Sequence, residues 1–162
     1  MSRRDEIRMT DDEVHGFLAG QQVINVATMG PNGRPHLAPL WYVPRRTDSG
    51  GAALETWTYG SSQKIANLRR LAEATVLIED GEAYEQLRGV SMECDVEIVD
   101  DPDRTLQMGT DLLHRYTFED ETIEVPPELV DFLRKQATKR VGLRFVPTKI
   151  VSWDHRKLGG TY

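Results

Sequence analysis

The sequence contains little of what disulfide-bonded, secreted and membrane proteins need. Cys94 is the single cysteine among 162 residues, so no intrachain disulfide can form and a reducing compartment is expected. No run of apolar residues is long enough to span a bilayer, and the charged stretch from Met1 to Glu6 does not resemble a secretory signal. These absences predict a cytoplasmic protein with no membrane partner.

Basic residues are fewer than acidic residues. Lysine and arginine together number 20 against 26 aspartates and glutamates, which gives a formal net charge of -6. Proteins that bind nucleic acid generally present a basic surface, so a nucleic-acid partner is not expected. The hydrophobic content of 39% and charged content of 28% are typical of a globular protein. This length predicts one domain over residues 1–162.

Signatures of side-chain catalysis are missing as well. Four histidines are present: His15, His36, His114 and His155. They lie in separate predicted elements without the spacing of metal ligands, so no metal site is predicted. The sequence has no Gly-x-Ser-x-Gly nucleophile motif and no glycine-rich dinucleotide or P-loop fingerprint. Alternation along the strand around Cys94 places this thiol on an apolar face, as a core residue. No catalytic residue is identified.

What the sequence does contain is a series of strand patterns joined by hairpin signals. Asn32-Gly33 predicts a type I′ turn between strands at 23–29 and 36–43. Pro39 cannot donate a hydrogen bond to a neighbouring strand, so its strand is expected at a sheet edge or a bulge. The remaining strand patterns cover 53–59, 74–79, 84–99, 140–146 and 149–153, and Pro147 separates the last two.

Helices are predicted at the margins of these strands. Thr10-Asp11-Asp12-Glu13 is a capping box that begins a helix ending at Gly20. Asp101-Pro102 and Pro126-Pro127 begin two further helices, which extend to about Tyr116 and Thr138. Strands and helices do not alternate regularly, so a doubly wound sheet is not expected. The fold class predicted is mainly β (α+β), a six-stranded antiparallel barrel with peripheral helices.

One stretch, from Trp57 to Arg70, indicates an anion site. The chain leaves a strand at Gly60 and begins a helix with Ser62 as N-cap and Lys64 in the first turn. A helix N-terminus offers unpaired N–H groups and the positive end of the dipole, so it suits a phosphate but disfavours a lysine. A phosphate bound between them would remove that conflict. The alternative is an ordinary strand-to-helix junction with Lys64 in solvent.

Aromatic residues lie on both sides of this stretch. They are Trp41 and Tyr42 on the proline-containing strand, Trp57 and Tyr59 on the next, and Trp153 on the last. One interpretation is that they fill the barrel core. The other is that they form a flat apolar slot for a planar ring whose phosphate is anchored nearby, as a flavin-like ligand requires.

An ordered set of motifs carries a family resemblance. The motifs are Asn25–Thr28 with the turn at 30–35, Pro39–Tyr42, Ser62–Lys64, Asn67–Arg70, Leu87–Ser91, Lys139–Leu143 and Ser152–Gly159. In this order, and over nearly the whole chain, the sequence resembles the pyridoxamine 5′-phosphate oxidase-like split β-barrel superfamily. Within it, the sequence is similar to the actinobacterial, mycobacterial-type flavin/deazaflavin oxidoreductase B branch.

The resemblance implies a fold, an assembly and a site. It implies an FMN-binding split barrel and a homodimer with two cofactor sites at the subunit interface. Residues implied to hold the cofactor phosphate are Ser62, Gln63, Lys64 and Asn67. Residues implied to line the ring are Ala38, Pro39, Leu40, Trp41, Trp57, Thr58 and Tyr59. The tail from Trp153 would close the site of the other subunit. Candidates for contact with a small-molecule substrate are Tyr59 and, in the tail, His155 and Arg156.

One departure from the family pattern bears on the cofactor. FMN-binding oxidases of this superfamily usually carry an arginine on the second strand as a further phosphate ligand. Here Pro39 lies near that register, and the next arginine along the chain is Arg45. This departure favours coenzyme F420 over FMN. The implied function is an F420-dependent oxidoreductase that transfers a hydride at ring carbon C5 to or from a small conjugated substrate. An FMN-dependent oxidase or reductase and a non-catalytic flavin- or F420-binding protein are the alternatives.

Overall fold

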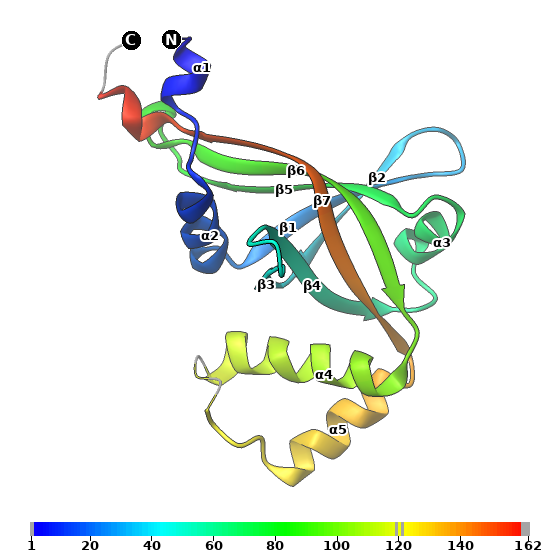
Figure 1. The fold of residues 1–162 in the computed structure, drawn as a ribbon. Coiled ribbons are helices and arrows are strands. Elements are labelled where there is room, and N and C mark those ends of the chain that lie inside the picture. The colour runs from blue at the N-terminus through cyan, green and yellow to red at the C-terminus, as the bar shows by residue number, and fades with distance from the viewer. Residues whose placement is uncertain (1, 119, 121, 160–162) are drawn as a thin grey trace.

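The computed structural model describes residues 2–118, 120 and 122–159. The described residues form a seven-stranded antiparallel sheet with the order β2-β1-β5-β6-β7-β4-β3 (Figure 1). The strands are β1 (Val23–Met29), β2 (Pro35–Trp41), β3 (Val43–Arg46), β4 (Ala52–Tyr59), β5 (Glu73–Asp80), β6 (Arg88–Val99) and β7 (Arg140–Asp154). The mainly β, α+β class is confirmed, and β2 with its Pro39 is an edge strand as predicted.

The predicted number of six strands is wrong, because the sheet has seven, and two strand boundaries also differ from the prediction. The stretch 36–43 divides at Tyr42, because β2 and β3 belong to opposite edges of the sheet. The stretch 140–153 is one strand, because Pro147 lies at a β-bulge and does not end it. Cys94 pairs with Pro147 and Glu93 pairs with Lys149, so the ladder resumes after the proline.

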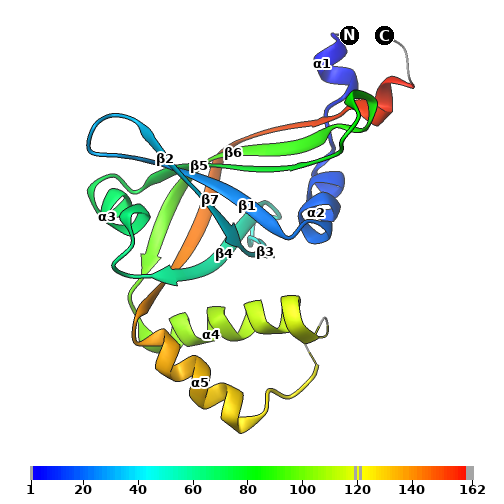
Figure 2. The same cartoon turned by 180° about the vertical axis from the view of Figure 1, so that it is seen from behind.

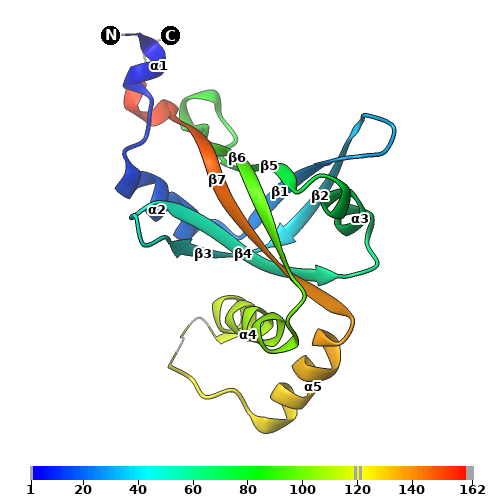
Figure 3. The same cartoon turned by 45° about the vertical axis from the view of Figure 1, so that its right-hand side comes forward.

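The sheet curls because its two edge strands are consecutive in the chain. Only Tyr42 separates the end of β2 from the start of β3, so the edges must meet at this residue. Tyr42 is fully buried, and its hydroxyl donates a 2.6 Å hydrogen bond to the Leu18 carbonyl oxygen. Figure 3 shows the resulting half-barrel, with β6 and β7 between the β1–β2 and β3–β4 pairs. The interior is filled by alternate strand residues, and Cys94 is among them.

The β1–β2 turn differs from the prediction. The Gly33 N–H donates to the Gly30 carbonyl at 3.1 Å, so Pro31 and Asn32 occupy the central positions of the turn. The fixed φ of Pro31 suits the first central position, and Gly33 follows with φ of 76°. The predicted type I′ turn centred on Asn32-Gly33 is therefore wrong by one residue.

Helices cover the ends of the half-barrel. They are α1 (Arg3–Glu6), α2 (Asp11–Gly20), α3 (Gln63–Arg70), α4 (Pro102–Leu113) and α5 (Pro127–Ala137), and a π-helical turn (His114–Phe118) follows α4. The capping box at Thr10 and the two proline-initiated helices are confirmed. Figures 1 and 2 place α4 and α5 at the end of the molecule opposite α1. Within the described residues, no helix combines the length and apolar character that crossing a membrane requires.

Candidate functional site

The start of α3 contains a hydroxyl group that the described chain leaves without a partner. Ser62 has the extended backbone of an N-cap, with φ of -73° and ψ of 154°, but its side chain makes no capping hydrogen bond. Its Oγ is buried and has no hydrogen-bond partner among the described residues. Because an unpaired buried polar atom is costly, and the first-turn amides of Gln63 and Lys64 have no intrahelical acceptor, this end of α3 is suited to a ligand with acceptor oxygens.

Lys64 is a half-buried cation at the same place. Burial lowers the pKa of its ammonium group, because it removes water that stabilises the charged form. Neither an ion pair nor a hydrogen bond joins its side chain to another described residue. The helix dipole also disfavours a cation in the first turn. An anion bound beside Lys64 would offset both effects.

The other two predicted phosphate ligands have different surroundings. The Gln63 amide donates to Asn67 Oδ1 at 2.9 Å, and Asn67 donates to Thr28 Oγ1 at 3.0 Å. Asn67 is only 1% exposed, so it ties α3 to β1 beneath the helix. Ser62, Gln63 and Lys64 therefore lie together at the helix start. Asn67 reaches that point only through its hydrogen bond to Gln63.

A cavity of about 340 Å³ lies between β2, β4 and the two helices α4 and α5. Its lining residues are Pro39, Leu40, Trp41, Thr56, Trp57, Gly109, Leu112, Leu113, Thr117 and Leu133. Four of the seven residues predicted to line the ring are among them, and none of the ten carries an ionisable side chain. Most of the lining is apolar, as in a pocket for an organic ring.

The remaining predicted ring residues lie next to this cavity. Ala38 is half-buried and Thr58 is buried, whereas Tyr59 is 51% exposed. Tyr59 shares a face of β4 with Trp57, two residues nearer to α3. At about 3.3 Å per strand residue, Trp57 lies roughly 10 Å from Gly60, where the approach to α3 begins. The cavity and the start of α3 are therefore separated by one short segment of β4.

Two residues that sequence reasoning missed cover the indole rings. Tyr116 stacks on Trp41, with ring centroids 4.5 Å apart and planes 2° from parallel. The Arg140 guanidinium lies over Trp57 at 4.8 Å and over Tyr59 at 4.2 Å from the ring centroids. Each indole therefore already has a planar neighbour. Arg140 belongs to the motif Lys139–Leu143 noted in the sequence, but its pairing opposite Tyr59 appears only in the strand register.

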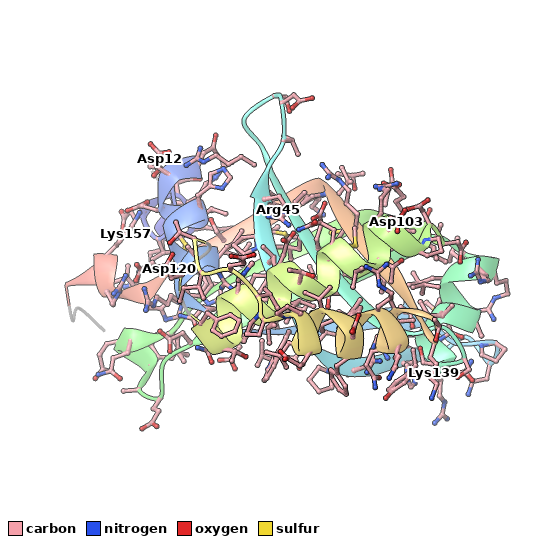
Figure 4. All side chains as sticks on the ribbon, turned by 90° about the horizontal axis from the view of Figure 1, so that it is seen from below. Asp12, Arg45, Asp103, Asp120, Lys139 and Lys157 are labelled. Carbon is pink, nitrogen blue, oxygen red and sulfur yellow. The ribbon has the colours of Figure 1, made fainter. Side chains whose placement is uncertain are left out.

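Ion pairs fix α4 over the sheet. Glu55 is buried and accepts 2.8 Å hydrogen bonds from Arg45 and Arg144. Arg45 also pairs with Asp111 of α4, and Figure 4 shows Arg45 beside this helix. Gln107 donates to the other oxygen of Asp111 at 2.8 Å. Glu55 and Asp111, each next in sequence to a lining residue, are thus already paired.

The structure does not bring the predicted tail residues to the cavity. Trp153 is the next-to-last residue of β7, and His155 and Arg156 follow this strand at the end of the molecule opposite α4 (Figure 1). The His155 Nδ1 atom lies 2.9 Å from the Tyr84 carbonyl oxygen, and Arg156 pairs with Asp154 at 2.6 Å. Any contact of these residues with a site in a second subunit stays a prediction.

Comparisons with known proteins agree with this architecture. Residues 10–154 match the family model described as pyridoxamine 5′-phosphate oxidase. The crystal structure of the conserved hypothetical protein Rv2991 from Mycobacterium tuberculosis is 36% identical, with a TM-score of 0.84 over 100% of this chain and 95% of that chain.

More distant solved structures share the fold. An F420 reductase is 23% identical, with a TM-score of 0.59 over 84% of this chain and 94% of that chain. The heme storage protein HutZ from Vibrio cholerae is 15% identical, with a TM-score of 0.63 over 88% and 94% of the two chains. No curated protein matches the sequence significantly. The family match over residues 10–154 shows that the chain belongs to the pyridoxamine 5′-phosphate oxidase family.

Proposed function

We propose that the protein binds coenzyme F420 and transfers a hydride between the deazaflavin ring and a small conjugated organic substrate. The observation that carries this proposal is the start of α3. There, within the part of the chain that the structure describes, Ser62 Oγ is buried without a hydrogen-bond partner and Lys64 is a half-buried cation without a carboxylate beside it. The residues present fit a phosphate group, because both lack the partner that a phosphate oxygen supplies.

The charge of this site favours F420 over FMN. The phosphate of FMN is a monoester that carries nearly two negative charges at neutral pH. The phosphate of F420 is a diester with a single charge. Lys64 is the one cation in the first turn of α3, and β2 contributes no arginine to help it. The single positive charge of Lys64 neutralises a phosphodiester. It would leave part of the negative charge of a phosphomonoester uncompensated at this half-buried position.

The protein's part in the reaction is positioning and exclusion of water. When bound, the cofactor supplies a ring carbon that accepts or gives the hydride. Pro39, Trp41 and Trp57 would hold the ring against the strands, since all three line the cavity. The absence of an ionisable lining side chain among the described residues assigns no general acid or base there, so the chemistry relies on the cofactor.

We also propose that the protein works as a homodimer. The outer face of β1 and β2 is apolar and exposed, with Leu37 69% and Trp41 57% exposed. Val23 and Met29 lie on the same face, because Val23 pairs with Trp41 and Met29 with Pro35. An apolar sheet face of this kind is typical of an interface. Light scattering of the wild type and of Leu37→Asp would give a dimer and a monomer, respectively.

Turnover is the test of the enzymatic proposal. Reduced F420 is mixed with the protein and a panel of quinones and other conjugated acceptors, and its reoxidation is followed by absorbance against a protein-free control. Protein-dependent reoxidation with at least one acceptor is expected. Reoxidation of reduced FMN alone would support the FMN-dependent alternative. Binding of F420 without turnover on any acceptor would support a non-catalytic binding protein. The cavity's lack of ionisable lining groups is the observation that favours this alternative.

A further inference from the structure

The cavity has two walls of different origin. One wall is formed by β2 and β4, the strands to which the cofactor ring is assigned above. The other wall comes from α4 and α5 and presents Leu112, Leu113 and Leu133. Nothing in the proposed function uses this second wall. A molecule that lies between the ring and the helices would touch these leucines.

The helix wall offers no partner for a charged group. The polar side-chain groups in the lining are the hydroxyls of Thr56 and Thr117 and the indole N–H groups of the two tryptophans. The nearest carboxylate on α4, that of Asp111, is already bonded to Arg45 and Gln107. The Arg140 guanidinium stacks on Trp57 but is not part of the lining, so a charged ligand group would lose its hydration here without gaining an ion pair, which is costly. A neutral ligand would lose little.

The distance between the walls is small and fixed. A Cβ atom at Gly109 would lie only 2.4 Å from the Trp57 ring, so α4 packs against this indole as closely as a glycine allows. The ion pair between Arg45 and Asp111 holds the helix in that position. The volume of about 340 Å³ is near the lower limit of ligand pockets. Shared with the cofactor ring, this space leaves room only for a small flat molecule of one or two rings against the helices.

We infer that the α4–α5 wall is the substrate side of the site and that it selects a neutral, flat, apolar acceptor of one or two rings. This inference rests on the proposed function only in calling the ligand a substrate, because the selectivity itself follows from the lining. The width of the pocket is set by Gly109 against Trp57, and its charge selectivity by the leucines.

Two ligands of one skeleton test the inference on the cofactor-free protein. Calorimetric titration compares 2-naphthol, which is neutral at pH 7, with 2-naphthoate, which is an anion. Leu113→Trp fills the cavity from a half-buried position, and Leu106→Trp is its matched control on the same helix, half-buried but outside the lining. Thr117→Trp, at an exposed lining position, replaces Leu113→Trp if circular dichroism shows that the latter is unfolded.

The expected result is binding of 2-naphthol at least 10-fold tighter than that of 2-naphthoate. Leu113→Trp is expected to weaken 2-naphthol binding at least 10-fold, and Leu106→Trp less than 2-fold. Equal or tighter binding of the anion, or equal effects of the two variants, would overturn the inference. A parallel F420 titration separates the two proposals: loss of F420 binding with naphthol selectivity retained would reject the proposed function alone. Normal F420 binding without naphthol selectivity would reject this inference alone.

Discussion

Replacing Lys64 with glutamine distinguishes a ligand-binding lysine from a structural one. The side chain is half-buried at the positive end of α3, and its pKa is lowered because burial removes hydrating water. It makes no ion pair with the described residues. In the cofactor-free protein this charge is therefore a cost. Its removal is expected to leave the melting temperature unchanged or to raise it.

The effect on cofactor binding has the opposite sign. A charge-assisted hydrogen bond to a phosphate contributes about 1–3 kcal/mol, which corresponds to a roughly 5- to 150-fold loss of F420 affinity in Lys64→Gln. Protonated Lys64 binds the phosphate, so affinity is also expected to fall as the pH rises toward its lowered pKa. The glutamine variant should lack this dependence on pH.

Fluorescence titration of F420 measures the affinity, and differential scanning fluorimetry measures the melting temperature. Lys135→Gln is the matched control, because this lysine is exposed on α5 and removes the same charge at a distance from Ser62. Equal effects of both variants on F420 affinity would mean that only the overall charge matters. Unchanged affinity in Lys64→Gln, or a lowered melting temperature with normal binding, would refute the assignment of this lysine to the phosphate.

Three further predictions concern stability. Gly109→Ala places a Cβ atom 2.4 Å from the Trp57 ring and is expected to cost about 1–3 kcal/mol of unfolding free energy, measured in urea; an unchanged midpoint would contradict the close packing. Glu55→Gln leaves two arginines without their shared carboxylate and is expected to cost about 2 kcal/mol, less than for a fully buried pair because both are about one-third exposed. The hydrogen bond from Arg156 holds the pKa of Asp154 below its ordinary value. The stability that this bond contributes is therefore present above the ordinary pKa and lost as the pH falls through the lowered pKa. Asp154→Asn should reduce the free energy of unfolding at pH 7 and flatten its decline in acid, and identical acid profiles of variant and wild type would contradict this prediction.

Local patterns in the sequence predicted much of the secondary structure because their causes are local. The capping box at Thr10, the proline at the start of α4 and the alternation around Cys94 each act within a few residues, and each is present in the structure. Two strand boundaries were predicted wrongly, at Tyr42 and at Pro147. At Tyr42 the chain passes from one sheet edge to the other, and at Pro147 the partner strand accommodates a bulge. Both depend on distant pairing.

In the site, too, features with local causes were predicted and features that depend on distant contacts were not. Ser62 and Lys64 were predicted from the strand-to-helix junction, and the structure places them together at the start of α3. The contacts of Trp57 with Gly109 and Arg140 were not predicted, because residues from three separate elements meet there. The helix wall of the cavity was missed for the same reason. Periodicity marks α4 and α5 as amphipathic helices but does not show which strand they cover.

The most direct test of the cofactor assignment is a side-by-side titration of the purified protein with F420, FMN and haem, followed by absorbance and fluorescence at equal ionic strength. We expect F420 to bind at least 10-fold more tightly than FMN, because Lys64 and the start of α3 match a singly charged phosphodiester. Tighter binding of FMN, or binding of haem alone, would contradict the account.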